Sequence, residues 1–220
     1  MRNASVRFAR LWWLQAAVVF GVVLGLVISP VSVQAQDPVP VKRVEEDWVL
    51  VLNDPSADNA APQVTCVMSP VGHADGVFAT LELNHGTLPE YRAGGLQLQV
   101  WNGEDWLTVR DHADTTLHQS GEVVTFTRKM WLNGGKLNFN VVNGNSSSWG
   151  AFGATDNIKL AIASSLSDLN GYSPDLSKSQ SGIGYGSQRV QTLKLNKIRY
   201  YDGLGNLLQE DTTPRVVHQQ

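Results

Sequence analysis

The feature that most constrains this chain is a two-residue alternation of apolar and polar side chains, which recurs through most of its 220 residues. In the run 77–84, Val, Ala and two Leu residues fall on one face, while Thr, Glu and Asn fall on the other. No stretch after Ala35 keeps the i, i+3, i+4, i+7 apolar spacing of an amphipathic helix over three turns. Gly, Asn, Asp and Pro separate the alternating runs, so the pattern predicts strands joined by turns.

Ten runs carry this strand pattern, and no helical crossover is predicted between them. Antiparallel strands joined in this way pack as two sheets, so the predicted fold is all-β: one two-sheet antiparallel β-sandwich of the jelly-roll type. In the run 106–110, we expect Leu107 and Val109 to face the core. The predicted strands are 48–52, 63–68, 77–84, 96–101, 106–110, 123–132, 137–142, 158–162, 189–201 and 207–210.

The longest of these runs, 189–201, changes phase partway along. Leu193 and Leu195 fall on one face of an ideal strand, whereas Ile198 and Tyr200 fall on the other. One extra residue in a strand reverses which face its side chains point to. The sequence therefore predicts a β-bulge near Asn196-Lys197.

The first 35 residues have the pattern of a secretory signal peptide. Three Arg residues in the first ten positions precede an almost wholly apolar stretch, which ends at Val33-Gln34-Ala35. Small residues at the −3 and −1 positions predict cleavage after Ala35 and export of the remainder to an extracellular, periplasmic or cell-surface location. An uncleaved membrane anchor is the alternative, because about 20 apolar residues can span a bilayer. Gln15 and Pro30 favour cleavage.

The remainder reads as one domain. We expect a short linker at 36–44, the β-sandwich at 45–211 and a flexible tail at 212–220, where no strand pattern is visible. Without the predicted signal peptide the chain has 14 basic and 20 acidic residues, a formal charge of −6. This balance disfavours nucleic acid as a partner, and it predicts no basic patch for a membrane.

The cysteine content limits which disulfides and metal sites the chain can form. A single cysteine, Cys66, excludes an intramolecular disulfide framework and any site with several thiolate ligands. Its neighbours on both sides are apolar, so we expect a buried thiol rather than a reactive or interchain one.

No catalytic motif stands out. There is no Gly-x-Ser-x-Gly elbow, and no pair of acids has the spacing on a strand that glycoside hydrolysis requires. No cofactor is expected, apart from a structural Ca²⁺ that the oxygen ligands of Asp54, Asp58 and Asn59 could hold. Two histidines and two acids within 111–118 could also meet on a cation, although a polar connection between strands is the simpler interpretation.

The sharpest functional signal comes from two tryptophans at a predicted hairpin. The Asn-Gly turn in 102–105 places Trp101 opposite Trp106 on the polar face of the sheet. Gln97 and Gln99 lie beside them on the same face. Exposed indoles flanked by amides can stack on a sugar ring while the amides bond its hydroxyls. The alternative is a cross-strand aromatic pair that only stabilises the hairpin.

Two further segments supply candidate ligand contacts. In the loop 143–153, Asn143, Asn145, Trp149 and Phe152 combine amides and aromatic rings, a composition typical of adaptable recognition loops. The alternative is that the two aromatic rings fold back onto the core. Tyr172 lies in 164–186, the longest stretch without a strand pattern, and long loops of this kind are often functional.

One known family shares a pattern with the second half of the chain. The strand, glycine turn and strand of 123–140 are followed by an Asn-Gly-Asn loop and later by Gly184-Tyr-Gly-Ser-Gln-Arg-Val190 and Ile198-Arg-Tyr-Tyr-Asp202. Over about 122–208 this pattern resembles the concanavalin A-like, laminin-G-type jelly roll. The resemblance implies a jelly-roll sandwich and sugar binding. Glucanases of that family carry Glu-x-Asp-x-(x)-Glu on one strand, whereas Leu81-Glu-Leu-Asn84 has one acid, so no catalytic residue is carried over.

Three hypotheses about function follow. The leading one is a secreted, non-catalytic β-sandwich that binds a polysaccharide, another glycan or another extracellular surface. The second is a hydrolase or lyase that acts on polysaccharide through a site not visible as a motif. The third is a structural component of the cell envelope or extracellular matrix. The oligomeric state is left open.

Overall fold

The computed structural model describes residues 38–54, 62–72, 76–84, 95–114, 117, 119–154, 156 and 158–220, with only the backbone for 109–114. The predicted signal peptide lies outside these residues. The chain divides into the units 1–37 and 38–220, and the account below concerns the second. Within the described residues, no helix is long and apolar enough to cross a membrane.

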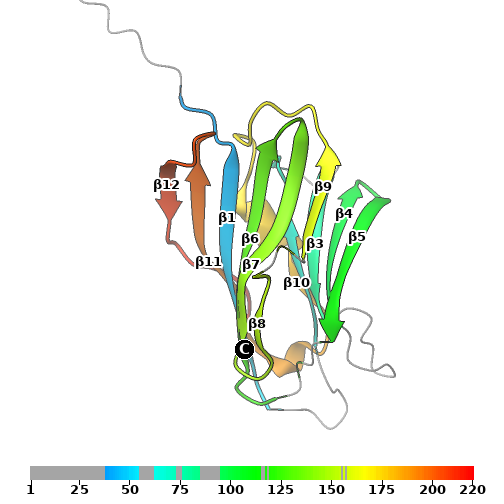
Figure 1. Ribbon diagram of the computed structural model, residues 1–220. Helices are drawn as coiled ribbons and strands as arrows, with labels where there is room; N and C mark the ends of the chain where they lie inside the picture. Colours follow the sequence, from blue (N-terminus) through cyan, green and yellow to red (C-terminus); the bar gives the residue numbers. More distant parts are fainter. Residues whose placement is uncertain are drawn as a thin grey trace, which may run out of the picture. The chain divides into compact units, whose positions relative to one another are not determined.

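Two antiparallel sheets form the domain and confirm the predicted all-β sandwich (Figure 1). The eight-stranded sheet contains β12 (Leu207–Asp211), β11 (Val190–Tyr201), β1 (Arg43–Leu52), β6 (Val123–Asn133), β7 (Lys136–Ser146) and β8 (Gly150–Phe152) in that order, with β13 (Arg215–Gln219) on β11 and β9 (Lys159–Ala163) on β7. The five-stranded sheet contains β10 (Gly182–Tyr185), β2 (Gln63–Met68), β3 (Val77–Leu83), β4 (Gly95–Asn102) and β5 (Asp105–Asp114) in that order. One α-helix, α1 (Pro174–Gln180), and a 3₁₀ turn at Ser187–Arg189 complete the described elements.

The core lies between the sheets and follows the alternation of each strand. Every second residue of β1 is buried, from Val44 to Leu52. Trp48 stacks on Phe126 of the neighbouring strand, with ring centroids 6.5 Å apart. Cys66 is fully buried in the same core, and burial raises the pKa of its thiol well above the usual range. The expectation of a buried cysteine is therefore confirmed.

The phase change in 189–201 is the predicted β-bulge. Asp47 pairs with Lys197 and Trp48 pairs with Leu195, which leaves Asn196 as the extra residue. Because of this bulge, Leu195 and Ile198 both reach the core.

A second bulge, which the sequence pattern does not predict, lies in β5 and makes the predicted facing of Leu107 wrong. Val100 pairs with Thr108 and Trp101 with Trp106, so Leu107 is unpaired, and it is 47% exposed rather than in the core. Val109, which was also predicted to face the core, pairs along the backbone with Gln99, and its side chain lies outside the described residues.

Two segments predicted to be irregular are ordered. In the tail predicted to be flexible, β13 pairs with β11 from Thr192 to Leu195, so this prediction is wrong. The stretch 164–186 contains α1 and β10. A short segment that adds to a sheet edge needs few apolar residues of its own, because its hydrogen bonds go to a strand that is already ordered.

Candidate functional site

The outward side of the five-stranded sheet carries a continuous set of polar and aromatic side chains. We call this set the polar face; its members are Thr65, Thr80, Glu82, Gln97, Gln99, Trp101 and Trp106.

Strand alternation produces the polar face. Leu96, Leu98 and Val100 of β4 are at most 1% exposed in the core, so the residues between them point to the other side of the sheet. In the register of the sheet, Gln97 pairs with Glu82 and Gln99 pairs with Thr80. The pairing places amide, hydroxyl and carboxyl groups from three adjacent strands in rows.

Hydrogen bonds within the polar face hold these side chains in place. The indole Nε1 of Trp101 donates to Gln99 Oε1 at 2.9 Å, and Thr80 Oγ1 donates to the same oxygen at 3.3 Å. Gln99 Nε2 in turn donates to Gln97 Oε1. Thr65 Oγ1 donates to Glu82 Oε2 at 2.7 Å. A network of this kind fixes side-chain orientation before any ligand arrives, which lowers the entropy lost on binding.

Glu82 is the titratable group of the polar face. Burial raises the pKa of its carboxyl group, while hydrogen bonds from Thr65 and Thr80 and the charge of Arg128 act in the opposite direction. A carboxyl group with a raised pKa holds its proton to higher pH than a solvated one.

Trp101 and Trp106 form an aromatic pair at the end of the β4–β5 hairpin, as the sequence predicts. Their ring centroids are 6.4 Å apart and their planes differ by 29°. Trp106 is 58% exposed, and its Nε1 donates to the carbonyl oxygen of Thr108 at 3.2 Å. The exposed ring offers a flat apolar surface next to the amides of the polar face.

The segment 143–153, predicted as a loop, consists mainly of the end of β7 and of β8, which pair in the eight-stranded sheet, so the structure does not bring its residues onto the strands of the polar face. Asn143 and Asn145 are exposed. Phe152 is 4% exposed and stacks on Trp149, with ring centroids 4.8 Å apart. The indole Nε1 of Trp149 donates to the buried carboxylate of Glu122 at 2.5 Å. Phe152 belongs to the core, which corrects its prediction as a ligand contact.

Tyr172 is also placed differently from the prediction. It is 8% exposed, and its hydroxyl donates to Glu46 Oε1 at 2.7 Å. Burial raises the pKa of this phenol well above 10, and the charge of Glu46 adds to the effect. Its polar atom is therefore used inside the sandwich and does not face a ligand.

Sequence reasoning missed three members of the polar face, Thr65, Thr80 and Glu82. Alternation places each on the outward side of its own strand, but only the pairing of β2 with β3 and of β3 with β4 brings them into one set with Gln97 and Gln99. Strand order is a long-range property, and no local pattern reports it.

The predicted metal ligands are only partly within the described residues. Asp54 accepts a hydrogen bond from Ser120, while Asp58, Asn59 and the side chains of 111–114 are not described. Among the side chains that the structure does describe, no three or more His, Cys, Asp or Glu residues gather into a possible metal site. The Ca²⁺ prediction stays a prediction.

Comparisons with known proteins add little. No protein-family profile matches the chain, and no curated protein matches it in sequence. Among solved structures, a crystal structure of Scytalido-glutamic peptidase with a peptide-based transition-state analogue matches over 80% of this chain and 82% of that one, with a TM-score of 0.34 and 8% identity. A likeness at this level carries no argument about function.

Proposed function

We propose that this protein is an exported carbohydrate-binding β-sandwich and that the polar face is its saccharide site. The observation that carries the proposal is the exposed Trp106 ring beside a network of amides that is already hydrogen-bonded in place. Ligand sites in proteins commonly combine an apolar surface with a few fixed polar groups, and this face has both.

The chemistry of a sugar ring fits this combination. One face of a pyranose carries C–H groups, which pack on the negative face of an indole. Its edge carries hydroxyls, which need both donors and acceptors. The amide of Gln97, which is 9% exposed, and that of the partly exposed Gln99 contain both kinds of group, and Glu82 adds a carboxyl group whose pKa is raised.

The proposal is tested by measuring polysaccharide binding of the protein and of Trp106→Ala, first by pull-down on a panel of insoluble polysaccharides and then by calorimetry with oligosaccharides. Trp106 is a suitable target because it is largely exposed, so its removal should leave the fold intact. Leu107→Ala is the matched control, because this neighbour on β5 is also exposed, at 47%.

We expect Trp106→Ala to weaken binding at least about tenfold, which corresponds to about 1.4 kcal/mol. Leu107→Ala should bind as the unaltered protein does. The proposal fails if the unaltered protein retains no glycan on the panel, or if Trp106→Ala binds with unchanged affinity.

A second candidate function is hydrolysis of the bound saccharide, and the raised pKa of Glu82 favours it. A carboxyl group that holds its proton to higher pH than a solvated one is better suited to act as a general acid. The register places Asp111 of β5 opposite Gln97, two strands from Glu82. Strands lie about 4.8 Å apart, so the two backbone positions are about 10 Å apart, while the side chain of Asp111 lies outside the described residues.

This second function has its own test. Glu82→Gln should abolish the release of new reducing ends from the bound polysaccharide while the polysaccharide is still retained. If the unaltered protein releases no reducing ends, or if Glu82→Gln releases them at the same rate, Glu82 is not a catalytic acid.

A further inference from the structure

The outward side of the eight-stranded sheet carries a hollowed surface, and its chemistry differs from that of the polar face. Two adjoining hollows of about 300 and 380 Å³ share Lys42, Leu132, Asn133 and Gly203 in their walls. Together they wrap around the turn between β6 and β7. We call the pair the basic cleft; its characteristic side chains are Lys42, Arg43, Lys129, Trp131 and Lys136.

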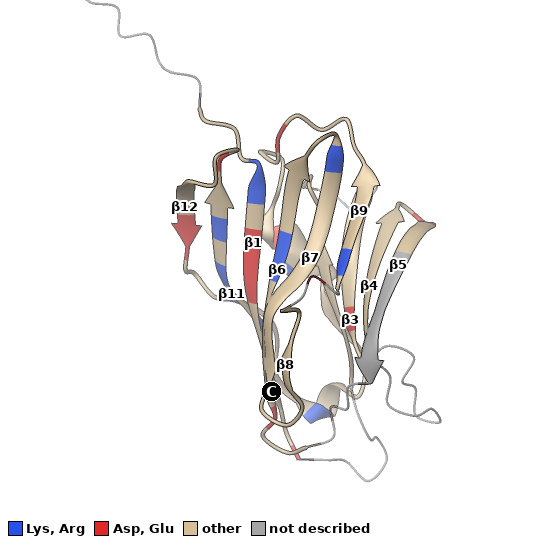
Figure 2. Ribbon diagram, viewed as in Figure 1, with Lys and Arg blue, Asp and Glu red and all other residues tan. Residues whose placement is uncertain are grey.

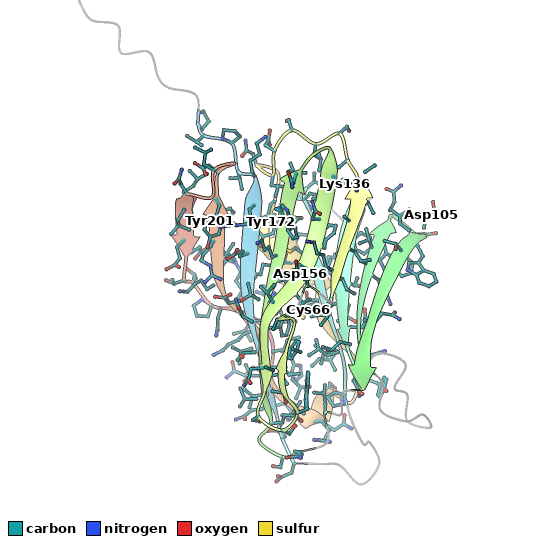
Figure 3. The ribbon with its side chains drawn as sticks, in the orientation of Figure 1. Cys66, Asp105, Lys136, Asp156, Tyr172 and Tyr201 are labelled. Atoms are coloured by element: carbon teal, nitrogen blue, oxygen red, sulfur yellow. The ribbon has the colours of Figure 1, made fainter. Side chains whose placement is uncertain are left out.

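The basic cleft concentrates positive charge on a chain that is acidic overall. Figure 2 shows Lys and Arg on the adjacent strands β1, β6 and β7, and Figure 3 shows Lys136 near one end of β7. Lys129 and Lys136 form no ion pair with any side chain in the part of the chain that the structure describes. Cations gathered in a concave surface raise the local concentration of anions.

Asp202 is an acid in the wall of the basic cleft, and it offsets part of this charge. It accepts hydrogen bonds from the Asn206 side chain at 2.8 Å and from the backbone nitrogens of Leu204 and Asn206, at 2.9 and 2.8 Å. These bonds lower the pKa of the Asp202 carboxyl group, so it stays ionised. The wall keeps an excess of positive charge from its basic residues Lys42, Arg43, Lys129 and Lys136.

Trp131 gives the basic cleft an aromatic surface. The ammonium groups of Lys129 and Lys159 lie 5.0 and 5.1 Å from the centre of its ring, within cation–π distance. Across the sheet Trp131 pairs with Arg43, whose guanidinium lies 3.7 Å from the centre of the Tyr201 ring and forms an ion pair with Glu45. The ring is partly exposed.

We infer that the basic cleft binds a short anionic saccharide, in which a sugar ring stacks on Trp131 and carboxylate or sulfate groups meet Lys129 and Lys136. The register of β6 and β7 places these two lysines on opposite sides of the Trp131 row, so each would meet a different anionic group. A long polyanion such as nucleic acid would extend beyond the cleft over a chain whose formal net charge is −3, which would repel it. A short charged saccharide can remain within the cleft.

The inference does not depend on the proposed function, because the two sites use different sheets and different side chains. Failure of one can therefore be distinguished from failure of the other. Trp106→Ala should leave binding at the basic cleft unchanged.

The test uses calorimetry with oligogalacturonate as the carboxylated probe and a sulfated disaccharide as the second anionic probe, each at low and high ionic strength. Neutral dextran oligomers, single-stranded DNA and vesicles containing phosphatidylserine are the comparison ligands. The variants are the double substitution Lys129→Gln with Lys136→Gln, and Trp131→Ala. The matched control is Lys178→Gln with Lys194→Gln, which changes the net charge equally outside the cleft. Circular dichroism checks that each variant is folded.

We expect one or both anionic sugars to bind the unaltered protein, with affinity that falls as salt increases. The double substitution in the cleft and Trp131→Ala should each weaken this binding at least about tenfold, while the control pair changes it less than about twofold. An equal loss in the control pair would overturn the inference. So would unchanged binding by Trp131→Ala, no binding of either sugar, or tighter binding of DNA or vesicles through the same lysines.

Discussion

Glu46 and Tyr172, which are 126 positions apart in the chain, are joined by a 2.7 Å hydrogen bond in which the phenol donates to a fully buried carboxylate. Trp48 Nε1 and Ser177 Oγ donate to the same carboxylate, at 2.9 and 2.6 Å. Buried Arg128 stands close enough for the charge of Glu46 to oppose the lowering of its pKa by burial. Arg128 Nη2 also donates to the carbonyl oxygen of Ala79, so this cluster connects the two sheets.

The first prediction concerns this buried cluster. Glu46→Ala should lower the free energy of unfolding by about 3–5 kcal/mol, because it leaves a buried cation and three buried donors without their acceptor. Glu210→Ala removes an exposed ion pair with Lys197 and should cost less than about 1 kcal/mol. Urea denaturation of both variants measures the difference. Similar losses in the two variants would show that the buried carboxylate does not hold the sheets together.

The second prediction is a pH dependence at Glu82. Because burial raises its pKa above 4.5, the usual value, the folded chain holds this proton over a pH range in which the unfolded chain has lost it. Stability from this group is therefore full below about pH 4.5 and falls as pH rises towards the folded-state pKa. Glu82→Gln removes that loss and keeps an acceptor for Thr65. Its thermal midpoint should exceed that of the unaltered protein at neutral pH and match it in acid. A constant difference across the range would contradict this.

The third prediction separates backbone strain from steric overlap at two glycines. Gly153 and Gly135 both have left-handed backbones, with φ of +75° and +72°. A Cβ on Gly153 would lie 2.4 Å from the carbonyl oxygen of Val141, whereas a Cβ on Gly135 meets nothing within 4 Å. Gly135→Ala should cost about 1–2 kcal/mol from the backbone alone. Gly153→Ala should cost at least about 1 kcal/mol more. Equal costs in chemical denaturation would mean that the overlap relaxes freely.

The fourth prediction concerns the C-terminal strand. Truncation after Pro214 removes β13, its hydrogen bonds to β11 and the ion pair of Arg215 with Asp211. We expect a loss of about 2 kcal/mol in the free energy of unfolding, because Val217 packs against the core as well. A flexible tail would have no such effect, so an unchanged unfolding curve would show that β13 contributes nothing.

Patterns within short stretches of the sequence predict those features of the structure that depend on neighbouring residues. Alternation locates the strands, the phase change locates the bulge at Asn196, and the turn residues predict the facing of Trp101 and Trp106. The bulge at Leu107 left no such sign, because the run is too short to show two phases.

The polar face and the basic cleft depend on pairings between segments that are distant in the sequence. For that reason the sequence predicts only some of their residues. Glu82 joins the polar face only because β3 lies beside β4. The basic cleft combines residues near 42, 131 and 203, and the negative net charge of the chain gives no indication of it. The sequence predicts Tyr172 in a long irregular loop, whereas in the structure its hydroxyl donates a hydrogen bond to the buried Glu46 of β1.

The central claim, that the polar face binds a saccharide, is tested most directly by the indole N–H signals of the protein in nitrogen-15 NMR spectra during titration with a neutral oligosaccharide. Beyond the predicted signal peptide the chain has five tryptophans. Their indole signals report separately on the core (Trp48), the polar face (Trp101 and Trp106), the basic cleft (Trp131) and the β7–β8 hairpin (Trp149). The account predicts that the signals of Trp101 and Trp106 shift with the same saturation curve while the buried Trp48 stays unchanged. Shifts confined to Trp149 or Trp131, or no shift at all, would contradict it.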